Sequence, residues 1–434
     1  MAKWSALFLL LATVVSGAAV PQQESVAFNT QTQLKDAHGL KKIPVTRNPE
    51  FKANGTLSIL RARAKYGFEP TYHKGPVNAQ AIGQTPATPD DYLGGDLEYI
   101  VPVPIGTPAQ TLNLDFDTGS SDLWVFSSKL TAASNVNHNV FTSSKSSTWK
   151  TLSGYSWSIE YADLSTASGT VGTDNVNLGG LVVKSQAVEL ATSVSTAFVK
   201  SANDGLVGLG FYKGTYGNTI RPTRQPNVVA NLISQGTVPA NAQLFTAALY
   251  SARDPESSFY TFGYVDQSLV AASGQSLSWT AIDPTLGFWT FPSTSAYVGG
   301  TLVSLSGNTA IADTGTTLAY LSDDVVDAFY AQVPGASYSS QDGGYIFPFD
   351  SANQLPSLTV AVGNKQFAIQ PEDLVFGYNH DSTQYFGGIQ SRGTNPSDIL
   401  GDVFLKSVYV VFDQGNTRIG VVPKIEATQY APSK

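Results

Sequence analysis

Short apolar stretches follow one another from about residue 99 to near the end of the chain. Turn-forming Gly, Pro, Asn, Asp and Ser residues separate them at short intervals, which is the pattern of an all-β protein. We therefore expect strands over residues 99–105, 111–116, 123–126, 156–161, 169–178, 182–190, 244–250, 259–262, 291–298, 358–362 and 408–412.

Only two segments have a helical pattern. Ser322 can cap a helix whose first turn contains two acids, and apolar residues then recur at helical spacing up to Val333, before Pro334. Residues 227–233 form a shorter candidate. Both are predicted to be packing elements.

One predicted strand ends in residues that can carry chemistry. Alternation places the apolar residues of the run 112–116 on one face and Asp115 and Asp117 on the other. Asp115 lies inside the strand, and we interpret it as solvated or hydrogen-bonded. Asp117 emerges where the strand breaks at Gly119, so its carboxylate is expected at the tip of a tight loop.

The loop sequence Asp-Thr-Gly occurs twice, at residues 117–119 and 313–315, each time after an apolar run. Two apolar residues and a glycine follow each copy at nearly equal distances, ending at Gly208 and Gly401. Such internal repetition predicts two copies of one lobe. A single Asp-Thr-Gly is usually only a turn, but two matched loops that face each other would bring two carboxylates together.

Composition narrows the possible functions. A chain of 434 residues exceeds a comfortable single core, so two lobes are expected. It has no Cys, which excludes thiol catalysis and zinc-thiolate sites. His138 and His380 stand alone without ligand spacing and are expected to be solvated, so we predict no metal and no cofactor. The net charge of -8 argues against nucleic-acid binding.

The N-terminal 80 residues differ from the rest. Residues 1–19 have the positive start, apolar core and small-residue end of a secretory signal peptide, and no later apolar run is long enough to span a membrane. Residues 21–80 carry nine Lys or Arg and four acids, whereas the remainder is acidic. This contrast predicts a basic pro-segment, 20–82, docked on an acidic body; a solvated basic linker is the alternative.

Several of these motifs together resemble the pepsin-type aspartic proteinases, and most of all their secreted fungal members. The resemblance rests on both Asp-Thr-Gly loops, on Trp124 after the first, on Tyr161-Ala-Asp163, and on both apolar-apolar-Gly segments. Short segments such as Gly154-Tyr-Ser-Trp-Ser-Ile strengthen the resemblance, which extends in order over residues 99–423.

The resemblance implies a fold and a set of roles. The fold is a bilobal pepsin-like one, with two duplicated β-barrel-like lobes at 83–270 and 271–434 and an active-site cleft between them. The implied site residues are the catalytic Asp117 and Asp313, their loop supports Gly119, Ser120, Gly315 and Thr316, the flap residues Tyr161 and Asp163 with Trp124 behind them, and the pro-segment inhibitors Lys65 and Tyr66.

The chain also departs from the family pattern. Ala162 and Leu164 replace the glycines that commonly flank the flap acid, which puts the detailed specificity in question. Relatives often carry one disulfide in the C-terminal lobe, but around Phe349–Asp350 and Tyr385 this chain has no cysteine.

We therefore expect a secreted, extracellular acid endopeptidase, made as a zymogen, monomeric and inhibited by pepstatin-like compounds. Its partners would be protein and peptide substrates, with large apolar residues around the cleaved bond and Lys accepted before it. Three alternatives remain at this point. They are a glycosidase, which would need carboxylates about 5–9 Å apart, a secreted β-sandwich lectin, and a catalytically inactive pepsin-like binding protein.

Overall fold

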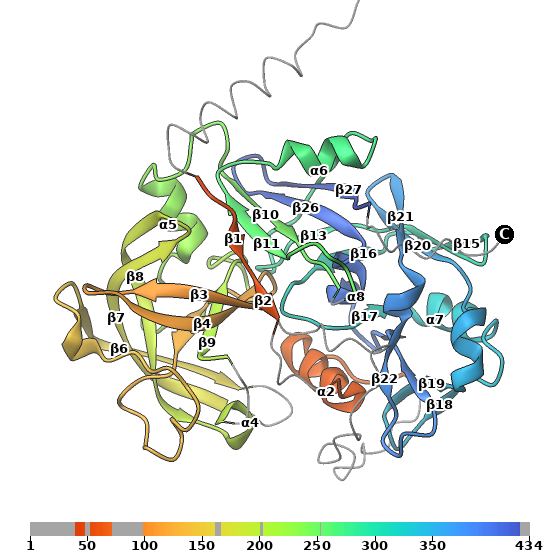
Figure 1. Ribbon diagram of the computed structural model, residues 1–434, viewed down its shortest axis with the longest axis horizontal. Helices are drawn as coiled ribbons and strands as arrows, with labels where there is room; N and C mark the ends of the chain where they lie inside the picture. Colours follow the sequence, from red (N-terminus) through yellow and green to blue (C-terminus); the bar gives the residue numbers. More distant parts are fainter. Residues whose placement is uncertain are drawn as a thin grey trace, which may run out of the picture.

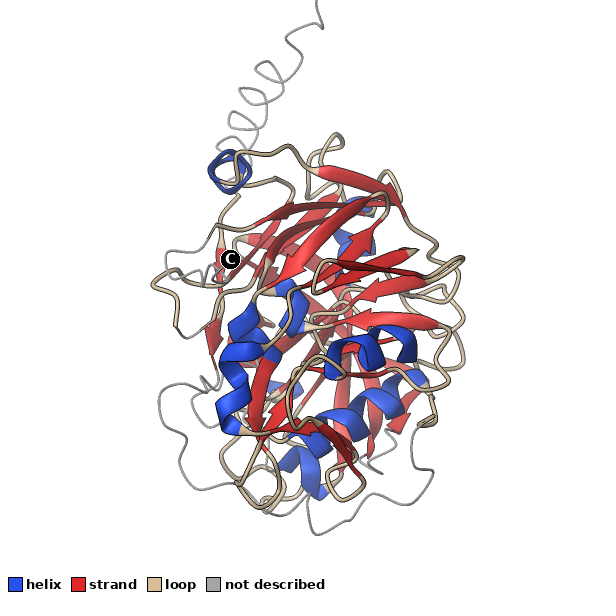
Figure 2. Cartoon of the chain, turned by 90° about the vertical axis from the view of Figure 1, so that its right-hand side faces the viewer, coloured by secondary structure: helices blue, strands red, loops and turns tan. Residues whose placement is uncertain are grey.

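The computed structural model describes residues 40–47, 53–71, 99–160, 166–199, 203–251 and 253–425 (Figure 1). The predicted signal peptide, the pro-segment end near residue 82, and Tyr161 and Asp163 with their neighbours Ala162 and Leu164 lie outside these residues. Strands dominate the described chain (Figure 2), which confirms the all-β prediction.

The first half of the chain builds an eight-stranded sheet. Its strands, in spatial order, are β2 (Thr46–Arg47), β3 (Tyr99–Ile105), β4 (Gln110–Asp117), β9 (Gly205–Gly208), β5 (Leu123–Val125), β8 (Leu181–Val194), β7 (Thr166–Leu178) and β6 (Lys150–Glu160). In β4 the apolar residues are buried and Asp115 is only partly so, as alternation predicts.

The second half repeats this arrangement in a five-stranded sheet. Its strands are β13 (Thr290–Pro292), β16 (Thr309–Ala312), β25 (Ser397–Leu400), β17 (Ala319–Leu321) and β24 (Ile389–Ser391). The parallel pair β4–β9, the antiparallel pair β9–β5 and the parallel pair β5–β8 correspond to β16–β25, β25–β17 and β17–β24. The predicted duplication is therefore confirmed strand by strand.

A third sheet joins the two halves. It consists of β1 (Ile43–Pro44), β11 (Phe259–Phe262), β10 (Leu244–Ala248), β26 (Val408–Asp413), β27 (Arg418–Pro423) and β12 (Ser278–Ala281). Phe245 on β10 stacks on Phe412 of β26 with ring centroids 4.7 Å apart, and Trp289 contacts both rings. Because strands from both halves share this sheet, the lobe boundary at 270 stays a prediction.

Two four-stranded sheets complete the second lobe. One contains β15 (Thr301–Ser304), β14 (Ser295–Val298), β20 (Leu358–Val362) and β21 (Lys365–Ile369). The other contains β18 (Ser337–Ser339), β19 (Gly344–Phe347), β23 (Tyr385–Gly387) and β22 (Val375–Tyr378).

An aromatic cluster includes Phe349 and Tyr385, the region where the family resemblance would lead one to expect a disulfide. The rings of Phe349 and Tyr385 lie 4.7 Å apart, and Tyr378 contacts both at 5.7 and 5.8 Å. Edge-to-face and stacked ring pairs at such separations are favourable beyond the area they bury. Ring contacts therefore join these two cysteine-free segments.

The helices of the described residues are short. They are α2 (Gly55–Tyr66), α4 (Thr196–Val199), α5 (Val228–Ser234), α6 (Gln267–Ala272), α7 (Asp323–Tyr330) and α8 (Asp402–Leu405), with 3₁₀ turns η1 (Ser143–Lys145), η2 (Phe349–Gln354) and η3 (Pro371–Leu374). The predicted helices at 227–233 and after Ser322 correspond to α5 and α7, although α7 ends at Tyr330, before Val333. No helix of the described chain combines the length and apolarity that a membrane crossing requires.

Candidate active site

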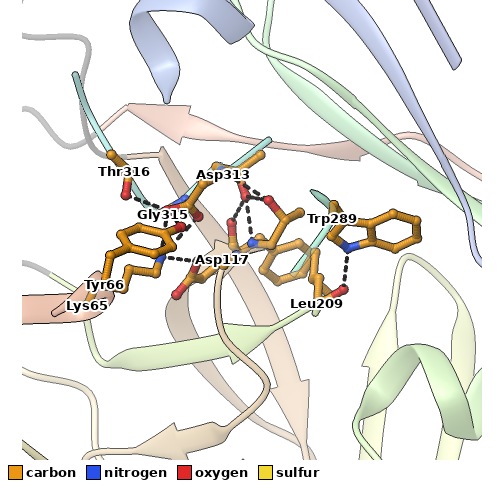
Figure 3. Close-up of polar contacts among 12 residues, drawn as sticks. Lys65, Tyr66, Asp117, Leu209, Trp289, Asp313, Gly315 and Thr316 are labelled. Carbon is orange, nitrogen blue, oxygen red and sulfur yellow. Dashed lines mark hydrogen bonds and ion pairs between the residues drawn. The ribbon is translucent and has the colours of Figure 1, made fainter. Parts of the chain in front are cut away.

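The two Asp-Thr-Gly loops face each other, with Asp117 and Asp313 side by side (Figure 3). Asp117 is the last residue of β4, and Asp313 directly follows β16. Both side chains are buried, and their carboxyl groups are hydrogen-bonded to each other. The structure thus places together the two acids that sequence spacing paired.

The middle threonine of each loop fixes the opposite loop. Thr118 N–H donates to the Thr314 hydroxyl at 3.1 Å, and Thr314 N–H donates to the Thr118 hydroxyl at 3.0 Å. The same hydroxyls then donate across the interface, Thr118 to the carbonyl of Ala312 at 2.9 Å and Thr314 to that of Phe116 at 2.5 Å. Every one of these bonds crosses from one lobe to the other, so they set the relative position of the two carboxylates.

The glycines of the loops leave the space that the acids need. A Cβ atom on Gly119 would overlap the carboxyl group of Asp313, and one on Gly315 would overlap that of Asp117. The N–H group of each glycine also donates to the acid of its own loop, Gly119 to Asp117 at 2.8 Å and Gly315 to Asp313 at 3.1 Å. Glycine at these two positions is therefore required by close packing.

Two residues of α2 contact the acid pair. Lys65 Nζ lies 2.6 Å from Asp117 Oδ1, 3.0 Å from Asp313 Oδ1 and 2.9 Å from Asp313 Oδ2. The Tyr66 hydroxyl donates to Asp313 Oδ2 at 2.7 Å, and its ring lies 5.2 Å from that of Phe288. The predicted pro-segment residues therefore contact both predicted catalytic acids.

Burial and neighbouring charges give the two acids different pKa values. Burial raises the pKa of Asp117 to about 6, and the neighbouring Asp313 adds to this while Lys65 opposes it. Burial also disfavours the charged form of Asp313, but Lys65 and hydrogen bonds from Asp117 and Thr316 outweigh it and lower the pKa to about 2. Two carboxylates in contact cannot easily both be ionised, so between these values the pair holds one proton.

The supporting residues agree with the expectation only in part. The Thr316 hydroxyl donates to Asp313 Oδ2, as the resemblance implies. Ser120 Oγ is buried and has no hydrogen-bond partner among the described residues, so the matching contact to Asp117 is not reproduced. Trp124 is buried and stacks on Trp157 at 5.8 Å. The flap residues Tyr161 and Asp163 lie outside the described chain.

The structure corrects the expectation for two histidines. The side chain of His138 is buried, stacks on Phe126 at 3.8 Å and faces the carbonyl of Val199 at 3.2 Å. His380 Nδ1 lies 3.0 Å from Asp342 Oδ2. Both are structural partners and not solvated residues, because tertiary contacts that leave no mark on the local sequence enclose them. The described residues contain no cluster of three or more potential metal-binding side chains.

The chain is similar in sequence to known proteases. The family profile described as eukaryotic aspartyl protease matches residues 98–424. Endothiapepsin of Cryphonectria parasitica is 41% identical over 94% of this chain and 96% of its own length. Penicillopepsin-1 of Penicillium janthinellum is 41% identical over 76% of this chain and 96% of its own length.

A solved structure agrees with these relatives. The aspartic proteinase from Irpex lacteus superposes with a TM-score of 0.62 at 28% identity, covering 78% of this chain and 97% of that one. The extent of the family match and the identity to full-length relatives agree with the duplicated lobes and the paired acids. The chain therefore belongs to the eukaryotic aspartyl protease family and is a pepsin-like aspartic endopeptidase of the fungal type.

Proposed function

We propose that Asp117 and Asp313 are the catalytic pair of a secreted, acid-activated endopeptidase. The observation that carries this proposal is that two buried carboxyl groups from matched loops lie together, both within 3.0 Å of one ammonium group. The ionised acid takes a proton from a water molecule, which attacks the peptide carbonyl carbon, while the protonated acid hydrogen-bonds the carbonyl oxygen. The roles of the two acids then exchange as the leaving amine is protonated.

The same geometry disfavours the alternatives. Glycosidases hold their two carboxyl groups about 5–9 Å apart, whereas here the carboxyls are hydrogen-bonded and share one ammonium ion. A lectin gives no reason for a buried acid pair. An inactive pepsin-like protein would be expected to lose an acid or a loop glycine, and Asp117, Asp313, Gly119 and Gly315 are all retained.

Residues before 82 would act as an inhibitory pro-segment. Lys65 Nζ occupies the position between the carboxylates where the attacking water would be activated. The pro-segment also makes contacts at some distance from the acids. The Thr56 hydroxyl donates to the carbonyl of Asp342 at 2.8 Å, and the N–H of Glu69 donates to the hydroxyl of Thr394 at 2.9 Å. Lys42 pairs with Asp266 at 2.5 Å. These contacts support docking by specific packing as well as by overall charge.

Acid would release the pro-segment. The positive charge of Lys65 lowers the pKa of both acids, although burial still leaves the pKa of Asp117 raised to about 6. The ion pair is complete when both acids are ionised, so this contact is strongest near neutrality and weakens as pH falls through about 6 and Asp117 takes up a proton. This sign agrees with a zymogen that is latent until it meets acid.

Large apolar residues around the cleaved bond, and Lys directly before it, are the proposed substrate preferences. Asp163 would pair with the lysine ammonium, a charge-assisted contact worth roughly 1.5–3 kcal/mol. The alternative is that Asp163 only stabilises a hairpin turn, as Asp often does.

A direct test uses the purified secreted protein. After acid treatment it should degrade casein at low pH, and a pepstatin-like inhibitor should block this. N-terminal sequencing before and after acid treatment gives the ends of the signal peptide and the pro-segment. Absence of acid proteolysis after verified removal of the pro-segment would contradict the proposal and favour the inactive binding protein.

A further inference from the structure

A second pair of buried carboxyl groups lies beside the first catalytic loop. Asp122 is 4% exposed and Glu189 is fully buried, and their carboxyl groups are hydrogen-bonded to each other. Among the described residues, neither carboxyl oxygen of Glu189 has an N–H or O–H hydrogen-bond partner.

The surroundings assign the proton to Glu189. Asp122 Oδ1 accepts the N–H of Thr219 at 2.7 Å and faces its hydroxyl at 3.4 Å, and Arg221 adds a favourable charge. These groups favour the ionised form of Asp122. Burial and the negative charge of Asp122 both disfavour the ionised form of Glu189. As a neutral acid, Glu189 can donate a hydrogen bond to Asp122.

The pair lies between the catalytic loop and the sheet that continues into the β6–β7 hairpin. The carbonyl of Asp122 accepts the N–H of Gly208 at 2.7 Å, next to the loop of Asp117. Glu189, on the central strand β8, is in register with Trp124 on β5 and Val171 on β7. A change at Glu189 therefore acts on both neighbouring strands.

The second lobe provides an internal comparison. Tyr320 pairs with Gln390 as Trp124 pairs with Glu189, and the residue two before Tyr320, matching Asp122, is the buried Leu318. Gln390 Nε2 donates to the carbonyls of Gly387 and Tyr345 at 2.9 and 3.2 Å, and its Oε1 accepts the N–H of Tyr345 at 2.8 Å. The same fold position is thus filled without an ionisable group, so the acid pair is not a requirement of the fold.

We propose that Asp122 and Glu189 are positioning residues that share one proton, and that losing this proton as pH rises releases the Asp117 loop from its sheet. This proposal rests on the proposed role of Asp117. It makes the first lobe the one that limits the enzyme to acid conditions.

The direction follows from proton linkage. An unfolded Glu releases its proton near its ordinary pKa of 4.5, whereas burial beside Asp122 raises the pKa of Glu189 well above that value. Above about pH 4.5 the folded protein holds one proton that the unfolded protein has lost. The contribution of Glu189 to the free energy of unfolding is therefore complete below that pH and declines as pH rises toward the folded pKa of Glu189. Over this range the unfolding constant increases by a factor of about ten per pH unit.

The experiment compares Glu189→Gln with the unchanged acid-activated enzyme. The amide can still donate to Asp122 but does not titrate. Samples are incubated between pH 4 and 8, returned to acid and assayed for remaining activity, while tryptophan fluorescence reports unfolding. We expect equal half-lives near pH 4, and at pH 7 an inactivation rate at least about tenfold slower in Glu189→Gln, the factor for one proton over one pH unit.

Two further variants separate titration from packing. Asp122→Asn removes the opposing charge and should slow inactivation in the same direction; it also serves if Glu189→Gln does not fold. Gln390→Leu breaks the neutral network of the second lobe and should speed inactivation equally at every pH. Unchanged pH dependence in Glu189→Gln, or in Asp122→Asn where only that variant folds, would overturn the proposal. Fluorescence needs no catalysis, so failure of the assigned protease activity would be recognised separately.

Discussion

Replacing Lys65 by Met tests the inhibitory contact at the acid pair. The Lys65 side chain is 11% exposed and its ammonium contacts both carboxylates within 3.0 Å. Met has a similar length and no charge, so the helix can keep its packing while the two acids lose their counter-ion. Removing one partner of a buried ion pair costs about 3–5 kcal/mol, which corresponds to about a 10²- to 10⁴-fold shift toward the undocked form.

The expected effect depends on pH. Near pH 7 both acids of the docked form are ionised, because the higher of their two pKa values is about 6, and the full cost applies. Below that value the pair takes up a proton, and the difference between Lys65→Met and the unchanged zymogen should shrink. The assay is cleavage of a quenched fluorescent peptide by freshly purified zymogen, followed from pH 4 to 7.5 before any processing is detected.

The matched control is Lys42→Met. It removes the same charge from the pro-segment, at a half-exposed ion pair with Asp266 distant from the acids, where such contacts contribute roughly 0–1 kcal/mol. At about pH 6, the upper end of the range in which the acid pair holds the single proton that catalysis needs, Lys65→Met should cleave the peptide and Lys42→Met should stay latent. Equal latency of both variants at that pH would refute the reasoning, and equal activation of both would assign inhibition to total charge.

Four other predictions follow from the site and the second lobe. Asp313→Asn should keep the fold but lower kcat roughly 10²- to 10⁴-fold at acid pH; near-normal turnover of the purified variant would contradict the acid pair. Thr314→Val removes two buried hydrogen bonds across the lobes and should lower the free energy of unfolding by about 2–4 kcal/mol in urea, whereas a loss under 0.5 kcal/mol, the usual size of surface effects, would show that the bonds do not hold the lobes. Asp163→Ser should lower kcat/KM about 10- to 100-fold for a peptide with Lys before the cleaved bond and leave a Leu peptide unaffected; equal losses would indicate a structural role. Phe349→Ala should destabilise the second lobe by about 1–2 kcal/mol through the lost ring contacts with Tyr385 and Tyr378, and an unchanged thermal midpoint would show that the cluster does not replace the disulfide.

The sequence predicts best what depends on local pattern. The bounds of β3, β11 and β20 agree with the predicted runs, because alternation and flanking turn residues are properties of the strand itself. The acid pair was predictable because duplication put the same signal in the chain twice. The predicted strand 291–298, by contrast, is two strands in different sheets, β13 and β14. Which partners a strand takes is decided by other segments of the chain, here β16 for β13, and β15 and β20 for β14.

Some site residues left a weaker signal. Thr118 and Thr314 were visible as the repeated middle letter of Asp-Thr-Gly, but their bonds across the lobes depend on how the lobes meet. Helix α2 was not predicted as a helix, because its buried side consists of Gly55, Thr56, Ile59 and Ala62, and a glycine and a threonine give little apolar pattern. The burial of His138 and the pairing of Glu189 with Asp122 likewise join residues more than 60 positions apart, beyond what a local pattern records.

The position of Lys65 in the chain has a consequence for biosynthesis. It precedes Asp117 by 52 residues and Asp313 by 248. Since chains emerge from the ribosome N-terminus first, the lysine is already present when the first acid appears, and long before the second can meet it. The acid pair can therefore assemble around its own counter-ion. Under the proposed inhibitory role of Lys65, the order of translation would protect the producing cell before any folded protease exists.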